Sequence, residues 1–167
     1  MTTPAEVLRA MFDHHLWATE TLIEHLERLP AERLDASVPG TYGSMIDTLT
    51  HTIDADTRYL LRLRDPTPPP ADDRVGISLA QLRSEMPEHR RRWDEVLDDL
   101  ERGTLSSAIL GRDDYPDTDP AESMLLIQAI HHGNDHRTQI CSTLGALDLE
   151  LPELDGWDYW ALQRRTS

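Results

Sequence analysis

Apolar residues recur at intervals of three and four in four long stretches of the chain. This spacing is typical of helices that bury one face. The first stretch begins at Pro4, within the capping sequence Thr3-Pro4-Ala5-Glu6, and ends at about Leu29, just before a proline. Its predicted buried positions form one seam, which consists of Met11, His15, Ala18, Leu22, His25 and Leu29.

A second helix is predicted from Ser44, after the glycine-containing turn at 40–43, to about Arg64. Its strongest apolar face consists of Met45, Leu49, Ile53, Leu60 and Leu63. A proline-rich connection from about Asp65 to Ile77 follows, and such a stretch is stiff and extended. It is long enough to carry the chain from one end of a helical bundle to the other.

A third helix is predicted to begin after Ser78, which forms a cap signature with Gln81, and to end at Gly103. Pro87 lies inside this helix and predicts a kink. The apolar face of the helix consists of Leu79, Leu82, Met86, His89, Trp93, Val96 and Leu100.

A fourth helix is predicted from the cap Asp119-Pro120-Ala121-Glu122 to Leu144, with Gly145 after it. A short segment with two tryptophans, from Asp155 to about Gln163, predicts a final helix that packs on the others. Strand-like alternation of useful length is absent from the sequence. The chain of 167 residues therefore predicts a single all-α domain, a four-helix bundle with a short C-terminal helix.

Composition narrows the function classes. The formal net charge is −15, which disfavours binding to phosphate backbones and to anionic membrane surfaces. The chain has no lysine, which excludes a Walker-type phosphate loop and a Schiff-base lysine. Its single cysteine, Cys141, excludes an intrachain disulfide and is expected to be a small core residue. With no signal peptide or membrane span apparent, we expect a cytoplasmic protein without nucleic-acid or membrane partners.

The candidate chemistry lies in the fourth helix. His132 and His136 are four residues apart, so they lie one above the other on the same helix face. That face is otherwise apolar, with Leu125, Ala129, Ile140 and Leu144. Two neutral histidines in a core leave several ring nitrogens that need partners, and one metal ion satisfies both. The alternative is a pair of core histidines that bind carbonyl or aspartate oxygens.

His51 of the second helix is the candidate third ligand. The strongest apolar face of that helix points away from it, but His51 shares a second stripe of small or uncharged residues with Thr48, Ala55 and Tyr59. Three histidines with one open coordination position form a catalytic rather than a structural type of metal site.

Three segments resemble the DinB-like family, which includes YfiT-type metal-dependent hydrolases and thiol-dependent transferases. They are Phe12-Asp-His-His-Leu-Trp17-Ala18-Thr, Leu49-Thr-His51-Thr-Ile53 and His132-xxx-His136-Arg137-Thr-Gln139. The resemblance covers nearly the whole chain. It implies an up-down-down-up bundle with the long crossover after the second helix. It also implies a divalent ion held by His51, His132 and His136, for which we expect Zn²⁺ or Ni²⁺. Members of the family frequently form dimers, so a homodimer is expected.

The sequence departs from the family pattern at two positions of the fourth helix. Gly133 stands where the family has glutamate, and Thr138 where it has glycine. If the glutamate orients a ligand, Asn134 or Asp135 could replace it. Arg137 is expected to be a buried ion-pair partner.

Three functions follow from these patterns. The leading hypothesis is a metal-dependent enzyme for a small molecule, either a thiol-dependent transferase or isomerase or a hydrolase. The second is a dimeric metal-binding bundle with a structural or sensing role. The third is a metal-free helical interaction module in which the histidines are core residues. Chelation and elemental analysis discriminate among the three.

Overall fold

The computed structural model describes residues 2–64, 74–105 and 122–166. Within these residues it contains five α-helices, one short 3-10 helix and no strand, which confirms the predicted all-α class. The elements are α1 (Pro4–Leu26), η1 (Ala31–Arg33), α2 (Met45–Arg64), α3 (Leu79–Arg102), α4 (Glu122–Ala146) and α5 (Gly156–Thr166). None of the described helices combines the length and apolar character that crossing a membrane requires.

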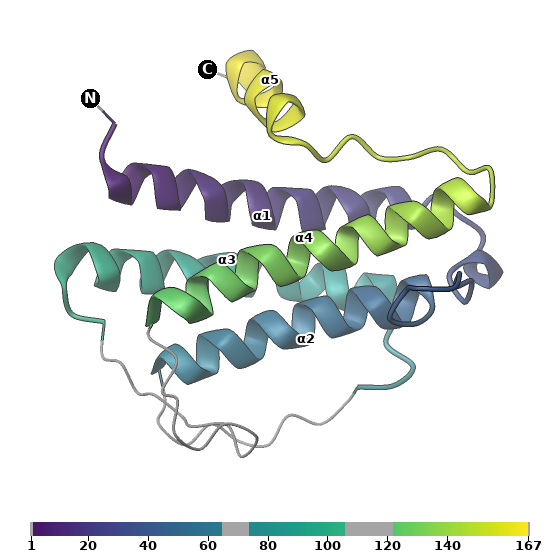
Figure 1. The fold of residues 1–167 in the computed structure, drawn as a ribbon, viewed down its shortest axis with the longest axis horizontal. Helices are drawn as coiled ribbons and strands as arrows, with labels where there is room; N and C mark the ends of the chain where they lie inside the picture. The colour runs from purple at the N-terminus through teal and green to yellow at the C-terminus, as the bar shows by residue number, and fades with distance from the viewer. Residues whose placement is uncertain (1, 65–73, 106–121, 167) are drawn as a thin grey trace.

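The four long helices form the up-down-down-up bundle that the resemblance implies. Helices α1 and α4 run in one direction, and α2 and α3 run in the other (Figure 1). Helix α2 ends at one end of the bundle, and α3 begins at the other (Figure 1). Residues 65–73 of the predicted crossover lie outside the described residues. Both α1 and α2 pack against α3 and α4, so α1 and α2 face each other diagonally across the bundle axis.

The helix ends largely follow the predicted capping signals. Thr3 with Glu6, and Ser78 with Gln81, form complete capping boxes. Gly103 ends α3 with a φ of 66°, a left-handed conformation that glycine adopts without strain. The predicted cap at 119–122 lies mostly outside the described residues.

Helices α1 and α4 end at residues other than the predicted ones. Helix α1 ends at Leu26 rather than at about Leu29, because the Leu29 amide bonds the carbonyl of Leu26, three residues back, and tightens the last turn. Helix α4 continues to Ala146, two residues beyond the predicted end. Helix α3 remains helical through Pro87, and the kink expected there stays a prediction.

Most residues of the predicted faces are buried in the core. All five predicted residues of the α2 face are buried, and Trp93 of α3 is fully buried. Met11 is an exception, because 45% of its surface is exposed. Helix α1 is turned so that Phe12 and Leu16 are buried in its place, which lets α1 contact both α3 and α4.

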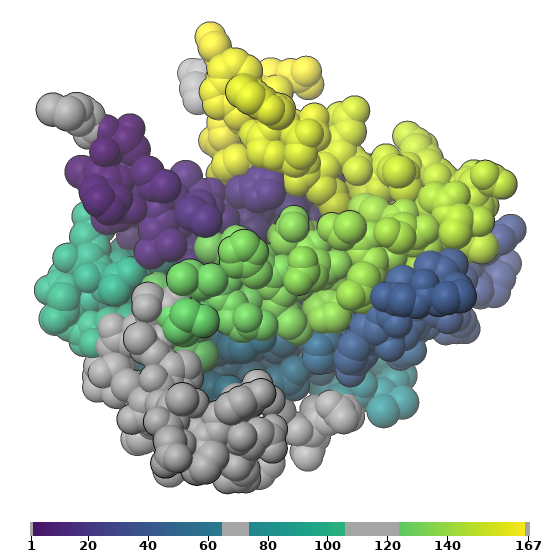
Figure 2. All heavy atoms as spheres, in the orientation of Figure 1, coloured from purple at the N-terminus to yellow at the C-terminus, as the bar shows by residue number. Residues whose placement is uncertain are grey.

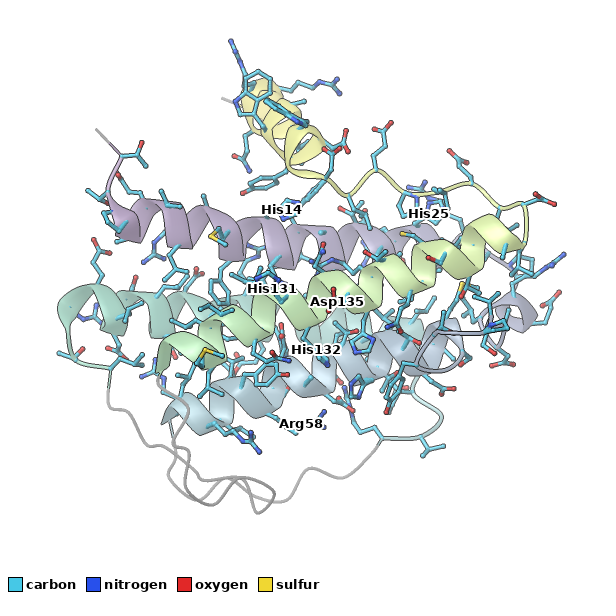
Figure 3. The ribbon with its side chains drawn as sticks, viewed as in Figure 1. His14, His25, Arg58, His131, His132 and Asp135 are labelled. Carbon is cyan, nitrogen blue, oxygen red and sulfur yellow. The ribbon has the colours of Figure 1, made fainter. Side chains whose placement is uncertain are left out.

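The C-terminal segment is attached to α1 through histidines. His14 and His25 bond the backbone carbonyls of Leu154 and Glu150 at 2.9 and 2.8 Å (Figure 3). Helix α5 contacts α1 through Tyr159, whose ring lies against His14 and Trp17. The final helix thus packs on α1 as predicted, but not through its two tryptophans, because Trp157 and Trp160 remain 76% and 51% exposed.

Candidate metal centre

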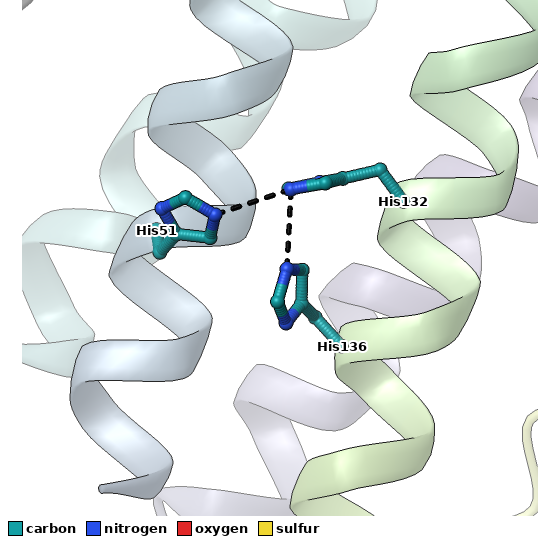
Figure 4. A group of neighbouring side chains, drawn as sticks. All are labelled: His51, His132 and His136. Atoms are coloured by element: carbon teal, nitrogen blue, oxygen red, sulfur yellow. Dashed lines mark hydrogen bonds between the residues drawn. The ribbon is translucent and has the colours of Figure 1, made fainter. Parts of the chain in front are cut away.

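Three imidazoles converge between α2 and α4. Nε2 of His132 lies 3.1 Å from Nε2 of His51 and 3.1 Å from Nε2 of His136 (Figure 4). The candidate ligand atoms of the three residues all lie within 4.8 Å of one another, so the group could hold a metal ion. The structure thus brings together the three histidines singled out in the sequence.

Packing of α2 against α4 creates this convergence. In the space-filling view, α4 lies along the molecule between α1 and α2 (Figure 2). Helix α2 turns its apolar face to the core, and the second stripe, which carries His51 and Tyr59, lies toward α4. The ring of His132 contacts both of these rings, with centroid separations of 5.0 Å to His51 and 5.9 Å to Tyr59. The second stripe of α2 therefore lines the site, as expected from its small or uncharged residues.

The loop before α2 covers one side of the cluster. The ring of Tyr42 stacks on His51 with a centroid separation of 4.0 Å and meets His136 edge-on at 5.5 Å. Tyr42 is 56% exposed, whereas His136 is buried and His51 is half-buried. The cluster therefore lies between the core and a surface that Tyr42 borders.

Gln139 fixes the tautomer of His136. Its Oε1 accepts hydrogen bonds from His136 Nδ1 at 3.2 Å and from the Tyr42 amide at 2.8 Å. Because an amide oxygen only accepts, the ring proton of His136 is on Nδ1 and its Nε2 carries a lone pair toward the cluster. One side chain thus orients a ring of the cluster and holds the loop that borders it.

The nitrogens of the cluster fit a cation better than they fit one another. A neutral imidazole nitrogen either donates or accepts, so Nε2 of His132 cannot donate to one neighbour while accepting from the other. Burial, followed by the proximity of His136 and His51, lowers the pKa of His132 to about 4, so its ring is neutral at pH 7. Neutral imidazoles that turn lone pairs toward one point form a nitrogen donor set for a transition-metal ion.

Three buried polar side chains, Arg137, His15 and Asp56, form a hydrogen-bonded line next to the cluster. Nε2 of His15 in α1 bonds Oδ2 of Asp56 in α2 at 2.7 Å, which links the two diagonal helices. NH1 of Arg137 in α4 lies 3.2 Å from Nδ1 of His15 and donates to Thr19 Oγ1 at 3.0 Å. Because a guanidinium only donates, Nδ1 of His15 accepts and its Nε2–H points to the carboxylate. His15 therefore lies between a buried cation, Arg137, and a buried anion, Asp56.

Asp56 and Arg137, at the two ends of this line, both remain charged at pH 7. Burial alone would raise the pKa of Asp56, but its interactions with His15, and less so with His89 and Arg137, outweigh burial and lower that pKa. Burial lowers the pKa of Arg137 to about 10, which leaves the guanidinium charged at pH 7. Arg137 is buried, as expected. The expected direct ion pair is not found among the described residues, because His15 lies between the guanidinium and Asp56.

Gly133 makes room for His15. A Cβ at position 133 would lie 2.3 Å from Cε1 of His15, which no real contact permits. Neither Asn134 nor Asp135 replaces the family glutamate as a buried orienting group, because both are exposed. His131 is also exposed, as expected from its position on the helix.

Sequence reasoning found the three histidines but missed the residues around them. Gln139 could have been found, since it lies three residues after His136 and neighbours it on a helix. Asp56 and His15 carry no such signal, because their contact joins positions 41 residues apart. Tyr42 is part of a turn, and its contact with the cluster depends on how the loop returns to α4.

The fold and the cluster define a helical bundle that could hold a metal ion between two of its helices. The chain matches the model of the DinB family over residues 1–166, nearly its whole length, and belongs to that family. Among curated proteins, none matches the chain significantly.

Proposed function

We propose that this DinB-family protein is a metal-dependent enzyme that acts on a small molecule, as a thiol-dependent transferase or isomerase or as a hydrolase. The observation that carries the proposal is the convergence of His51, His132 and His136, whose candidate ligand nitrogens all lie within 4.8 Å of one another. We expect these residues to hold one divalent ion, Zn²⁺ or Ni²⁺. Such an ion acts as a Lewis acid that lowers the pKa of a water molecule or thiol in its open position.

The residues of the chain supply the remaining parts of the site. Gln139 keeps the Nε2 lone pair of His136 directed at the cluster. Tyr42 covers one side of His51 with an aromatic ring that stays exposed on its outer side. The cluster is thus covered on one side only, and this arrangement favours a small organic substrate, which would lie against the ring of Tyr42. The homodimer implied by the resemblance stays a prediction, which light scattering of the purified protein tests.

A second candidate is a metal-binding bundle without catalysis. The buried line of Arg137, His15 and Asp56 favours it, because this line ties three helices together next to the histidines. In that case the ion would add rigidity to a junction that is already cross-linked. The two candidates agree on metal binding and differ only in turnover.

Metal content and activity of two matched variants test the proposal. His132→Ala removes the central ligand, whereas His131→Ala removes an exposed histidine at the next position of the same helix. We expect one divalent ion per chain in the wild type and in His131→Ala, and none in His132→Ala. Metal-dependent consumption of a low-molecular-weight thiol with an electrophile, or of an ester or amide, then identifies the enzyme.

The outcomes separate the hypotheses. A wild-type protein that binds neither Zn²⁺ nor Ni²⁺ at stoichiometric concentration contradicts metal binding altogether. Stoichiometric metal without turnover of either substrate class favours the second candidate. Retention of the ion by His132→Ala contradicts the ligand assignment.

A further inference from the structure

Two buried polar atoms next to the cluster lack hydrogen-bond partners among the residues that the structure describes. They are Nδ1 of His132 and Oδ1 of Asp56. A third atom of this kind, Nε1 of Trp93, belongs to α3. Buried polar groups are nearly always paired in folded proteins, so each of these atoms requires an explanation.

The two atoms near α4 have complementary chemistry. When Nε2 of His132 binds a metal ion, the proton of the neutral ring is on Nδ1, which makes that atom a donor. Oδ1 of Asp56 belongs to an ionised carboxylate and only accepts. Its other oxygen, Oδ2, already accepts from His15 at 2.7 Å.

The helices bring these two residues toward each other. The ring of His132 lies between the rings of His51 and Tyr59, at 5.0 and 5.9 Å. These two residues are eight positions apart on α2, and Asp56 lies between them on the side turned to the core. In addition, His15 contacts both Asp56 and the backbone of α4 at Gly133, the residue after His132. The carboxylate of Asp56 is thus near enough to His132 for its charge to act on that ring.

We infer that Asp56 is the positioning residue for His132: in the metal-loaded protein its Oδ1 accepts the Nδ1–H of His132, directly or through one buried water molecule. This inference rests on the metal binding proposed above. The line from Arg137 through His15 would then end at a ligand, and it would hold the carboxylate in one orientation. Metal-bound histidines commonly donate their second ring nitrogen to a carboxylate, which fixes the ring and makes it a stronger ligand.

A pair of isosteric variants on α2 tests the role of the carboxylate. Asp56→Asn replaces the acceptor that faces His132 with an amide, whose NH₂ group would meet the Nδ1–H. Asp54→Asn makes the same change two residues away, where the carboxylate bonds Arg74. Titration of Zn²⁺ against a chromophoric chelator should show binding about 10- to 100-fold weaker in Asp56→Asn. In Asp54→Asn the affinity should stay within about twofold of the wild type, because that carboxylate is paired elsewhere.

Nitrogen NMR of the wild-type protein provides a measurement that does not depend on the variant folding. In the Zn²⁺-loaded protein with ¹⁵N-labelled histidine, the Nδ1–H proton of His132 should be shifted downfield and exchange slowly with water. A His132 Nδ1–H that exchanges as fast as that of exposed His131 would overturn the inference.

The affinity data separate this inference from the function on which it depends. If the wild type binds no Zn²⁺, the proposed metal centre is wrong. If the wild type binds Zn²⁺ and a folded Asp56→Asn variant binds it equally well, only the role of Asp56 is wrong.

Discussion

The imidazole of His15 occupies the volume that a side chain at position 133 would need. A Cβ added to Gly133 would lie 2.3 Å from Cε1 and 2.9 Å from Nδ1 of His15. His15 cannot move aside without loss, because both of its ring nitrogens are engaged, one by Asp56 and one by Arg137. The glycine that interrupts the family pattern is therefore the residue that admits the buried histidine.

Gly133→Ala is expected to destabilise the protein, although alanine is the better helix former by about 1 kcal/mol. The methyl group would displace His15 and disturb its bond to Asp56, and overpacking of this kind costs about 1–3 kcal/mol. Urea denaturation measures the difference in the free energy of unfolding.

Gly145→Ala, on the same helix, serves as the control for Gly133→Ala. The nearest atom to its added Cβ is 3.9 Å away, an ordinary contact, so this variant should be neutral or slightly more stable. In a His15→Ala background, the cost of Gly133→Ala should be much smaller, because the two closest contacts are removed and only Nη1 of Arg137, at 3.0 Å, remains close. The same cost in both backgrounds would show that the clash is not the cause.

Gln139→Ala is expected to weaken metal binding, because His136 would lose the acceptor that fixes its tautomer. Loss of such a partner commonly costs 10- to 100-fold in affinity, and we expect about tenfold here. The Tyr42 amide loses the same acceptor, so its hydrogen exchange should accelerate. Gln139→Glu keeps an acceptor at the same place and should retain most of the affinity. Unchanged affinity in Gln139→Ala would show that His136 needs no such support.

His89 is expected to make stability depend on pH. Because the hydroxyl of Thr57 donates to the carbonyl of Ile53, it accepts from His89 Nε2 at 2.8 Å. Burial lowers the pKa of His89 from the usual 6.5. The unfolded chain therefore binds the proton more readily, and stability falls as pH decreases from above 6.5 toward the lower folded value.

The variant His89→Gln isolates this contribution, since glutamine keeps a donor for Thr57 but does not titrate. Urea midpoints of the chelator-treated protein between about pH 8 and about pH 5 measure the slope. The slope should be smaller in His89→Gln than in the wild type. An equal slope in the two proteins would assign the acid sensitivity to other groups.

Removal of metal by a chelator is expected to leave the fold intact. The core is built from apolar residues of all four long helices, and the histidine cluster lies at its edge. A ligand at about 100 times its dissociation constant adds about 2.7 kcal/mol of stability, so the melting temperature should fall by a few degrees without loss of helical circular dichroism. Collapse of the helical signal on chelation would instead indicate a structural metal site.

The helices could be predicted because their signals are local. Spacing, caps and breakers lie within a few residues of each element, and the α2 face that the pattern selected is fully buried. The buried face of α1 was harder to predict, because Met11 and Phe12 are adjacent apolar residues. Packing of α1 against α3 and α4 decides which of the two is buried.

The three candidate ligands could be predicted for a similar reason, but the contacts that hold them in place could not. The spacing of His132 and His136 is a property of one helix, and His51 lies on a stripe of uncharged residues. The contact between His15 and Asp56 joins helices that face each other diagonally, and a pattern that treats polar residues as surface overlooks a buried carboxylate. The direction of each helix came from the resemblance, because helix lengths alone permit several topologies.

The nitrogen atoms of the cluster come from positions that are 81 residues apart in the chain. The last of the four long helices to leave the ribosome contributes two of them, and the second helix contributes the other. Neither half of the polypeptide can thus assemble the cluster alone, and a nascent chain exposes only isolated histidines until α4 docks. Uptake of an ion at this place would therefore report that α2 and α4 have docked on each other.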